Sequence, residues 1–256
     1  LLFGADYSRS RANIDARINI PAPANLSPLN LFNPTYGLAN RLPFDQQPAL
    51  ARVQDVTTSR FGLFVQDQID FSDEISLVAG VRYDTTNQDV IKAVSLVDPA
   101  GRTLSQSLDA FTPRLGLVYQ PTPELALYGS YSRSFTPSSD TNVAGDFLTP
   151  EEGEGYEIGI KAELLDRRLI ATLAYFDITK RNVATPDPTA PAFLNASVAT
   201  GQQRSQGVEL DITGEILPGW NLIANYAYTD ARVTRDNRFP VGNSLVGVTE
   251  HSASLW

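Results

Sequence analysis

Polar and apolar residues alternate at every position between residues 156 and 164. One set is Tyr156, Ile158, Ile160, Ala162 and Leu164, and the other is Glu157, Gly159, Lys161 and Glu163. A repeat of two residues predicts a β-strand whose two faces differ in character. The second face carries charges of both signs, which a dry protein core would not accept. The segment is therefore typical of a barrel with lipid outside and water, or a polar plug, inside.

The same alternation recurs along the chain, for example in residues 199–216 and 220–234. Ten strands are predicted, at residues 1–20, 53–70, 75–92, 108–120, 125–135, 154–165, 168–183, 199–216, 220–234 and 248–256. Several are longer than the roughly 5–6 residues usual in globular sheets. A tilted strand that crosses a bilayer needs about 9–11 residues, and these strands reach that length.

Short and long connections alternate between the predicted strands. The short ones are polar or proline-bearing turns at residues 71–74, 121–124, 166–168 and 217–219. The long ones are rich in Pro, Gly, Asn and Asp and run near residues 21–52, 93–107, 136–153, 184–198 and 235–247. Outer-membrane barrels have short periplasmic turns and long external loops. We therefore predict an all-β fold, an antiparallel up-and-down transmembrane β-barrel represented by about ten strands of a larger barrel, with essentially no helix.

Composition narrows the possible functions. The 256 residues carry a net charge of −9 without a basic cluster, which argues against nucleic acid as a partner. Cysteine is absent, which excludes a thiolate metal site, and His251 is the only histidine, which excludes a histidine-rich metal cluster. The three carboxylates of residues 151–154 suit a hard cation, or they simply lead into the next strand. We predict that the chain is not an enzyme and holds no cofactor and no resident metal.

Four strings resemble the barrel strands of TonB-dependent siderophore receptors. They are FGLFVQDQIDFSDEISLVAGVRYD (61–84), FTPRLGLVYQPTPELALYGSYSRSFTP (111–137), TPEEGEGYEIGIKAELLDRRLIATLAYFDITKRNV (149–183) and GQQRSQGVELDITGEILPGWNLIANYAYTDARV (201–233). In addition, LFNPTYG (31–37) is similar to an extracellular-loop motif of the ferrichrome and hydroxamate-type branch. Each string alone is a weak pattern, but the series runs in order over nearly the whole chain.

This resemblance implies an outer-membrane receptor that imports ferric siderophores with energy from TonB. Receptors of this family have a TonB box, a globular plug and a barrel of about 22 strands. Residues 1–256 are therefore expected to be an incomplete TonB-dependent receptor β-barrel domain, with the plug and TonB box absent from this chain. The expected partners are outer-membrane lipid, the TonB–ExbB–ExbD system and the ferric siderophore, which is a transported ligand rather than a cofactor.

Two sets of candidate site residues follow from this interpretation. The first is a charged row that faces the lumen and comprises Arg114, Glu157, Lys161, Glu163, Glu209, Asp211 and Glu215. Its partners are either groups of the plug or charges on neighbouring strands. The second set consists of loop aromatic residues that could contact a ferric siderophore, namely Phe32, Tyr36, Phe44 and Phe147. Aromatic rings suit such a compact, amphipathic ligand, although packing within the loops would also explain them.

Two other functions remain open. A passive porin-type channel would share the long loops, and a plug and TonB box encoded upstream would distinguish the receptor from it. A soluble all-β binding domain, such as a sandwich, would bury its apolar face inside the protein. Partition into detergent would favour the barrel, whereas solubility in buffer would favour the sandwich.

Overall fold

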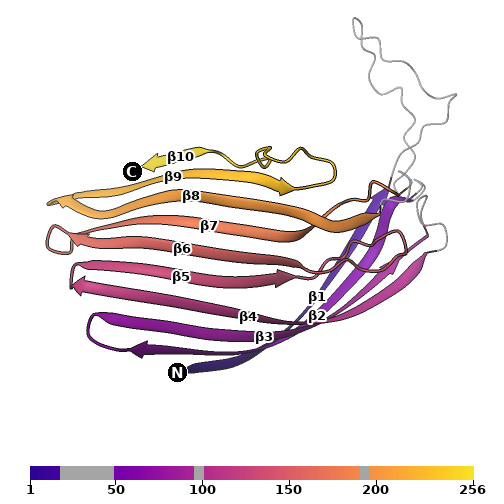
Figure 1. Cartoon of the computed structure of the whole chain (residues 1–256), viewed down its shortest axis with the longest axis horizontal. Coiled ribbons are helices and arrows are strands. Elements are labelled where there is room, and N and C mark those ends of the chain that lie inside the picture. The colour runs from indigo at the N-terminus through magenta and orange to yellow at the C-terminus, as the bar shows by residue number, and fades with distance from the viewer. Residues whose placement is uncertain (18–48, 95–100, 191–195) are drawn as a thin grey trace, which may run out of the picture.

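The computed structural model describes residues 1–17, 49–94, 101–190 and 196–256, and in these ranges it is one sheet of ten strands. Each strand pairs antiparallel with its neighbours in sequence (Figure 1). The strands are β1 (Leu2–Arg17), β2 (Ala49–Asp70), β3 (Ile75–Lys92), β4 (Arg102–Thr122), β5 (Leu125–Thr136), β6 (Glu151–Leu164), β7 (Leu169–Pro186), β8 (Ser197–Leu217), β9 (Trp220–Arg235) and β10 (His251–Leu255). The predicted up-and-down order is confirmed. The described ranges contain no helix that could cross a bilayer.

The main difference from the predicted boundaries lies at the start of β4. The sequence pattern predicts a loop over residues 93–107, but the strand begins at Arg102, which pairs with Lys92 of β3. Ser and Gln residues in this segment suggest loop chemistry. They still alternate with apolar residues, and Leu104 lies opposite Val90, which is fully buried. Pairing with β3 therefore outweighs the polar composition of the segment.

Tight turns gather at one end of the sheet and the long connections at the other (Figure 1). In the β2–β3 turn, the Ser72 hydroxyl accepts hydrogen bonds of 3.2 Å from the backbone N–H groups of Glu74 and Ile75. In the β6–β7 turn, Leu165, Asp166 and Arg167 have φ values of 52°, 57° and 66°. These left-handed residues reverse the chain between two strands without a longer loop.

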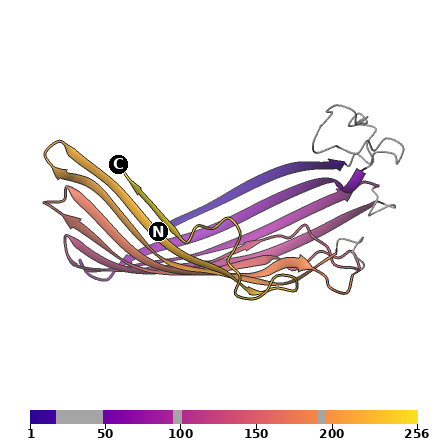
Figure 2. The ribbon, with the colours of Figure 1, turned by 90° about the horizontal axis from the view of Figure 1, so that it is seen from above.

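The sheet forms an open, curved shell (Figure 2). Buried strand residues such as Thr86, Val90, Ala174 and Ala231 all lie on its polar face. Side chains crowd together on the inside of a bend, so this distribution marks the polar face as the concave one. No second sheet covers the opposite, apolar face in the part of the chain that the structure describes, so the sandwich interpretation is wrong.

Candidate functional site

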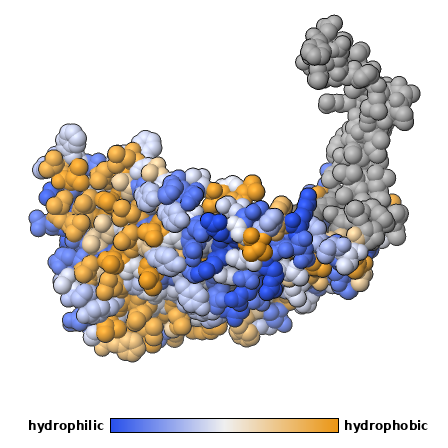
Figure 3. All heavy atoms as spheres, turned by 45° about the horizontal axis from the view of Figure 1, so that its top comes forward, coloured by the Kyte–Doolittle hydropathy of each residue, from blue (hydrophilic) through white to orange (hydrophobic). Residues whose placement is uncertain are grey.

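The strand register sorts the side chains onto two faces. On the apolar face, Leu127 pairs with Ile160, Ile160 with Leu173, and Leu173 with Leu210, across four strands. Ile158 on the same face is 62% exposed. An exposed apolar surface of this breadth is what a lipid-facing barrel wall requires. In the view of Figure 3, apolar side chains gather toward the end with the tight turns and hydrophilic ones toward the long connections.

An aromatic pair and an ion pair lie where the apolar face approaches the long connections. The rings of Tyr131 and Tyr156 lie 5.0 Å apart, a contact typical of a half-wet membrane interface. Closer to the long connections, Arg133 pairs with Glu152 at 3.2 Å on the same face. The transition from rings to ion pairs within a few residues fits the boundary between hydrocarbon and water.

All seven residues of the predicted charged row lie on the polar face. Two of them pair close to the tight turns, Glu163 with Arg167 at 3.3 Å and Glu215 with Arg168 at 3.7 Å. Glu157 accepts a hydrogen bond of 2.7 Å from the Tyr128 hydroxyl. Glu163 and Glu215, at the turns, and Glu157, farther along β6, therefore all have partners within the described chain.

The other four residues of the row have no such partners. Arg114, Lys161, Glu209 and Asp211 form no ion pair with any residue that the structure describes, and all four are exposed. The two carboxylates among these four residues, Glu209 and Asp211, line an open recess of about 410 Å³ together with Asn225 on β9. The sheet therefore presents unpaired negative charge over β8, beside β9.

A cluster on β1 and β3 was not predicted from the sequence. Arg82 lies between two carboxylates: its Nη1 is 2.6 Å from Asp6 and its Nη2 is 2.7 Å from Asp84. Its Nε also donates to both oxygens of Asp84, at 2.9 and 2.8 Å. Asp84 is only 5% exposed, so this guanidinium–carboxylate arrangement is both bidentate and largely desolvated. The alternation of Val81, Arg82, Tyr83 and Asp84 could have revealed half of this cluster, but not its partner on β1.

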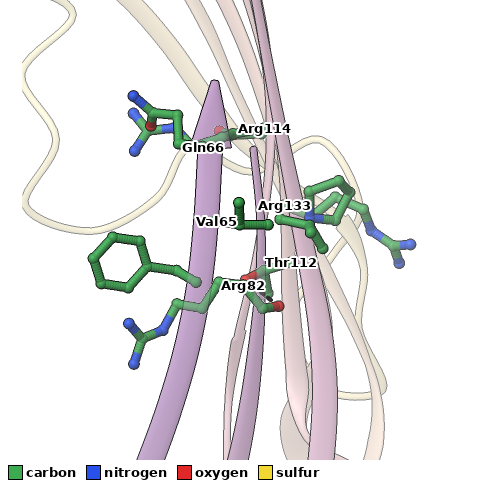
Figure 4. A pocket seen from close by; sticks show the side chains of 10 residues that line it. Val65, Gln66, Arg82, Thr112, Arg114 and Arg133 are labelled. Carbon is green, nitrogen blue, oxygen red and sulfur yellow. Dashed lines mark hydrogen bonds between the residues drawn. The ribbon is translucent and has the colours of Figure 1, made fainter. Parts of the chain in front are cut away.

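Beside this cluster lies a recess of about 400 Å³ on the polar face. Figure 4 shows the side chains of Gln66, Arg82 and Arg114 extending to one side of the strands and that of Arg133 to the other. Thr112 and Ser132 complete the polar lining. The recess thus combines guanidinium groups with amide and hydroxyl groups, which suits an oxygen-rich anion.

The long connections are tied to the strand ends by side chains. Lys92 donates to the Thr141 hydroxyl at 3.1 Å, Gln106 to the Ser138 carbonyl at 2.8 Å, and Asn237 to the Thr200 hydroxyl at 2.9 Å. Near the β7–β8 connection, the Thr189 hydroxyl and backbone N–H donate to Asp187 and hold the pKa of that carboxyl below its usual value. Hydrogen bonds therefore hold the described parts of these connections against the strand ends at this end of the sheet.

Only one of the four predicted loop aromatics falls within the described ranges. Phe147 is half-buried and forms an isolated bridge with Thr141 in the β5–β6 connection. Phe32, Tyr36 and Phe44 lie outside the described residues. Their contact with a ligand stays a prediction. The carboxylates of residues 151–154 are engaged by cations: Glu151 pairs with Lys180 and Glu154 with Arg181. No group of three metal-ligating side chains occurs in the ranges that were described.

This two-faced sheet defines a class of protein, the wall of an outer-membrane β-barrel. The profile of the family "TonB dependent receptor-like, beta-barrel" matches residues 1–256. The chain is 38% identical over 257 residues to the metal-pseudopaline receptor CntO of Pseudomonas aeruginosa, covering 100% of this chain and 35% of that protein. It is 33% identical over 259 residues to the ferrichrome outer membrane transporter/phage receptor of Escherichia coli, covering 100% of this chain and 33% of that protein.

Solved structures share the fold. The siderophore receptor PiuA from Acinetobacter baumannii matches with a TM-score of 0.76 and 25% identity, over 99% of this chain and 40% of that one. The ferric-catecholate import receptor Fiu matches with a TM-score of 0.74 and 20% identity, over 99% of this chain and 38% of that one. The chain spans about a third of the length of CntO and of the ferrichrome transporter.

The chain belongs to the family of TonB-dependent receptors and forms part of their β-barrel domain. The predicted fold, an antiparallel transmembrane barrel of which ten strands are seen, is confirmed. Its location is the bacterial outer membrane. The match to a hydroxamate-type branch is not established, because the relatives include receptors for different metal complexes.

Proposed function

We propose that this chain forms part of the wall of a receptor that binds ferric siderophores, or related metal chelates, and imports them with energy from the TonB–ExbB–ExbD system. The observation that carries the proposal is the ten-stranded sheet with one apolar and one charged face, which matches siderophore receptors over 99% of its length. The relatives named above are receptors and transporters, in keeping with a protein that moves a ligand and performs no covalent chemistry. Within this class, LFNPTYG supports a ferrichrome or hydroxamate-type ligand.

The two faces have separate roles in this proposal. The apolar face meets lipid, and the charged row faces a lumen that holds a plug. Unpaired charges such as Lys161, Glu209 and Asp211 need water or partners of opposite sign. We therefore assign these unpaired charges to contacts with the plug, whereas Glu163 and Glu215 pair with arginines of the adjacent turns. Ligand recognition is assigned to the long connections, with Phe147 and the loop aromatics Phe32, Tyr36 and Phe44 as candidates.

Uptake measurements on the full-length gene test this function. A host that lacks its own siderophore receptors would express the full-length protein, including whatever is encoded upstream of residue 1. Under iron limitation, uptake of radioactive iron supplied as chelates should saturate with chelate concentration and vanish in a strain without TonB. Uptake that persists without TonB and rises linearly with concentration would instead identify a passive channel. A plug and a TonB box in the upstream coding sequence would support the receptor independently.

A further inference from the structure

Strand β4 extends beyond the part of it that pairs with β5. The two strands pair from Thr122 and Leu125 as far as Arg114 and Ser132, and no pairing beyond that level occurs in the described ranges. β4 nevertheless stays paired with β3 as far as Arg102, whereas the rest of β5 pairs only with β6 (Figure 1). One edge of β4 is therefore without a neighbouring strand near the long connections.

This edge of β4 carries a regular row of backbone groups. Alternate residues of an antiparallel strand direct both backbone groups toward the same neighbour. The N–H of Gln120 donates to the Glu74 carbonyl at 2.7 Å, so even-numbered residues of β4 bond to β3 and odd-numbered residues face the other side. Pro113 is the first odd-numbered residue beyond the last pair with β5, and it has no N–H to donate. The odd-numbered residues that follow, which we call the open edge, are Thr103, Ser105, Ser107, Asp109 and Phe111.

The β5–β6 connection lies against the concave face of this hairpin rather than along the open edge. Its contacts come from side chains of that face, because Lys92 donates to the Thr141 hydroxyl and Gln106 to the Ser138 carbonyl. No backbone hydrogen bond joins the connection to the open edge in the part of the chain that the structure describes. Phe111, at one end of the edge, is 68% exposed. The edge is thus accessible from outside the barrel.

Side chains beside the open edge define the chemistry of a partner. On the outer face, Asp109 accepts a hydrogen bond of 2.9 Å from the Tyr83 hydroxyl, and Asp89 accepts one of 2.6 Å from the Ser105 hydroxyl. Neither carboxylate forms an ion pair with a described residue. Directly opposite side chains on paired strands interact, so a basic residue opposite Asp109 and an apolar one opposite Phe111 would stabilise an added strand.

We propose that the open edge of β4 binds an extended segment of an external protein, which joins the sheet as an antiparallel strand. Pairs of N–H and C=O groups repeat along the edge about every 7 Å, a spacing that another extended polypeptide matches along its whole length. The segment carries an apolar residue opposite Phe111 and Lys or Arg opposite Asp109. This interaction goes beyond the proposed import of chelates, because it uses backbone groups on the outside of the wall and not the lumen.

Disulfide trapping on the full-length receptor tests both the edge and its register. Residues 1–256 contain no cysteine, so Ser107→Cys places a thiol on the open edge. The probe is the synthetic peptide VTKTCTVT, whose first residue lies opposite Phe111, its lysine opposite Asp109 and its cysteine opposite position 107. The control peptide VTKCTTVT has the cysteine moved by one position, which turns the thiol to the other face. VTKTCTVT should form the mixed disulfide roughly tenfold faster than the control.

Two further comparisons separate strand addition from chance contact of thiols. Ser105→Pro, combined with Ser107→Cys, removes an N–H of the open edge but no bond to β3, and should slow trapping roughly tenfold. Ser105→Ala keeps that N–H and should trap the peptide as fast as Ser107→Cys alone. VTETCTVT, with glutamate opposite Asp109, should react more slowly than VTKTCTVT.

Three outcomes would overturn the inference. Equal trapping of VTKTCTVT and VTKCTTVT would show that no register exists and that the thiols meet by collision. Trapping that Ser105→Pro leaves unchanged would exclude pairing through the backbone. Disulfides between two receptors in place of receptor–peptide disulfides would identify a second copy of the chain as the occupant. Chelate uptake by the Ser105→Pro receptor should equal that of wild type, and its loss would show that the edge belongs to the import site.

Discussion

Arg82 lies across Gly62, and its Nη2 atom occupies the space that a β-carbon at position 62 would fill. The two residues belong to adjacent strands, since Gly62 pairs directly with Asp84, the carboxylate that holds Arg82. The missing side chain therefore lets the guanidinium reach Asp6 on β1 while it stays bonded to Asp84 on β3. A glycine on one strand thus makes an ion-pair cluster possible across three strands.

Gly62→Ala should displace Arg82 and break at least its contact with Asp6. We expect a loss of about 1–3 kcal/mol in the free energy of unfolding, because overpacking and an ill-paired charge act together. Urea unfolding of the full-length receptor in detergent, followed by tryptophan fluorescence, measures this loss.

Gly116→Ala is the control for this substitution. Gly116 lies on the same face, on β4, but a β-carbon there meets only the β-carbon of Val78, at 3.9 Å. That is an ordinary contact, so the free energy of unfolding should change by less than about 0.5 kcal/mol. A comparable loss at both positions would contradict the role assigned to Gly62.

The strands are well predicted from the sequence because their signal is local. Alternation is a property of each segment by itself, so the opposite facing of Ile158 and Glu157 follows from their own strand alone. The cluster of Asp6, Arg82 and Asp84 could not be predicted in this way. Asp6 and Arg82 lie 76 residues apart, and which residue of β1 meets β3 depends on how both strands are registered against β2.

At the start of β4, local composition predicts the wrong structure because pairing with a neighbouring strand decides it. Composition around residues 102–107 suggests a loop, yet the strand continues because β3 offers a complete row of backbone partners as far as Lys92.

The candidate site, too, could be predicted from the sequence only in part. The charged row follows from alternation alone, whereas the unpaired hydroxyl of Thr86 opposite Arg60 emerges only from three-dimensional packing.

Ile160→Arg should strongly disfavour insertion, because Ile160 lies in the apolar face between Leu127 and Leu173. A cation on the lipid side near the bilayer midplane costs roughly 2–4 kcal/mol. Folding of the full-length receptor into lipid vesicles, monitored by heat-modifiable migration on gels, gives the folded fraction. Thr213→Arg is the matched control, since Thr213 is exposed on the polar face, and it should fold nearly as well as wild type. Equal defects in the two variants would mean that the faces are assigned wrongly.

Two ion pairs on different faces should differ in strength. The side chains of Arg82 and Asp84 are 31% and 7% exposed. Those of Arg11 and Asp55, which lie 3.0 Å apart toward the β1–β2 connection, are 71% and 27% exposed. Double-mutant cycles with Arg→Gln and Asp→Asn should give a coupling of about 1–3 kcal/mol for the first pair. The second should give less than about 1 kcal/mol, because water screens it. A stronger coupling for Arg11 and Asp55 would show that exposure does not govern these pairs.

Ligand binding should depend on the long connections and not on the tight turns. Tyr36→Ala and Phe44→Ala, in the long connection between β1 and β2, should weaken chelate binding without lowering the yield of folded receptor, since external loops are where the ligand arrives.

Ser72→Ala, in the tight turn between β2 and β3, is the control. It removes two hydrogen bonds to the Ser72 hydroxyl and should lower stability by about 1 kcal/mol while affinity stays the same. Quenching of intrinsic fluorescence by the chelate measures affinity, and urea unfolding measures stability. If the turn variant loses affinity while the loop variants keep it, the two ends of the sheet are inverted, and the receptor interpretation loses its main structural support.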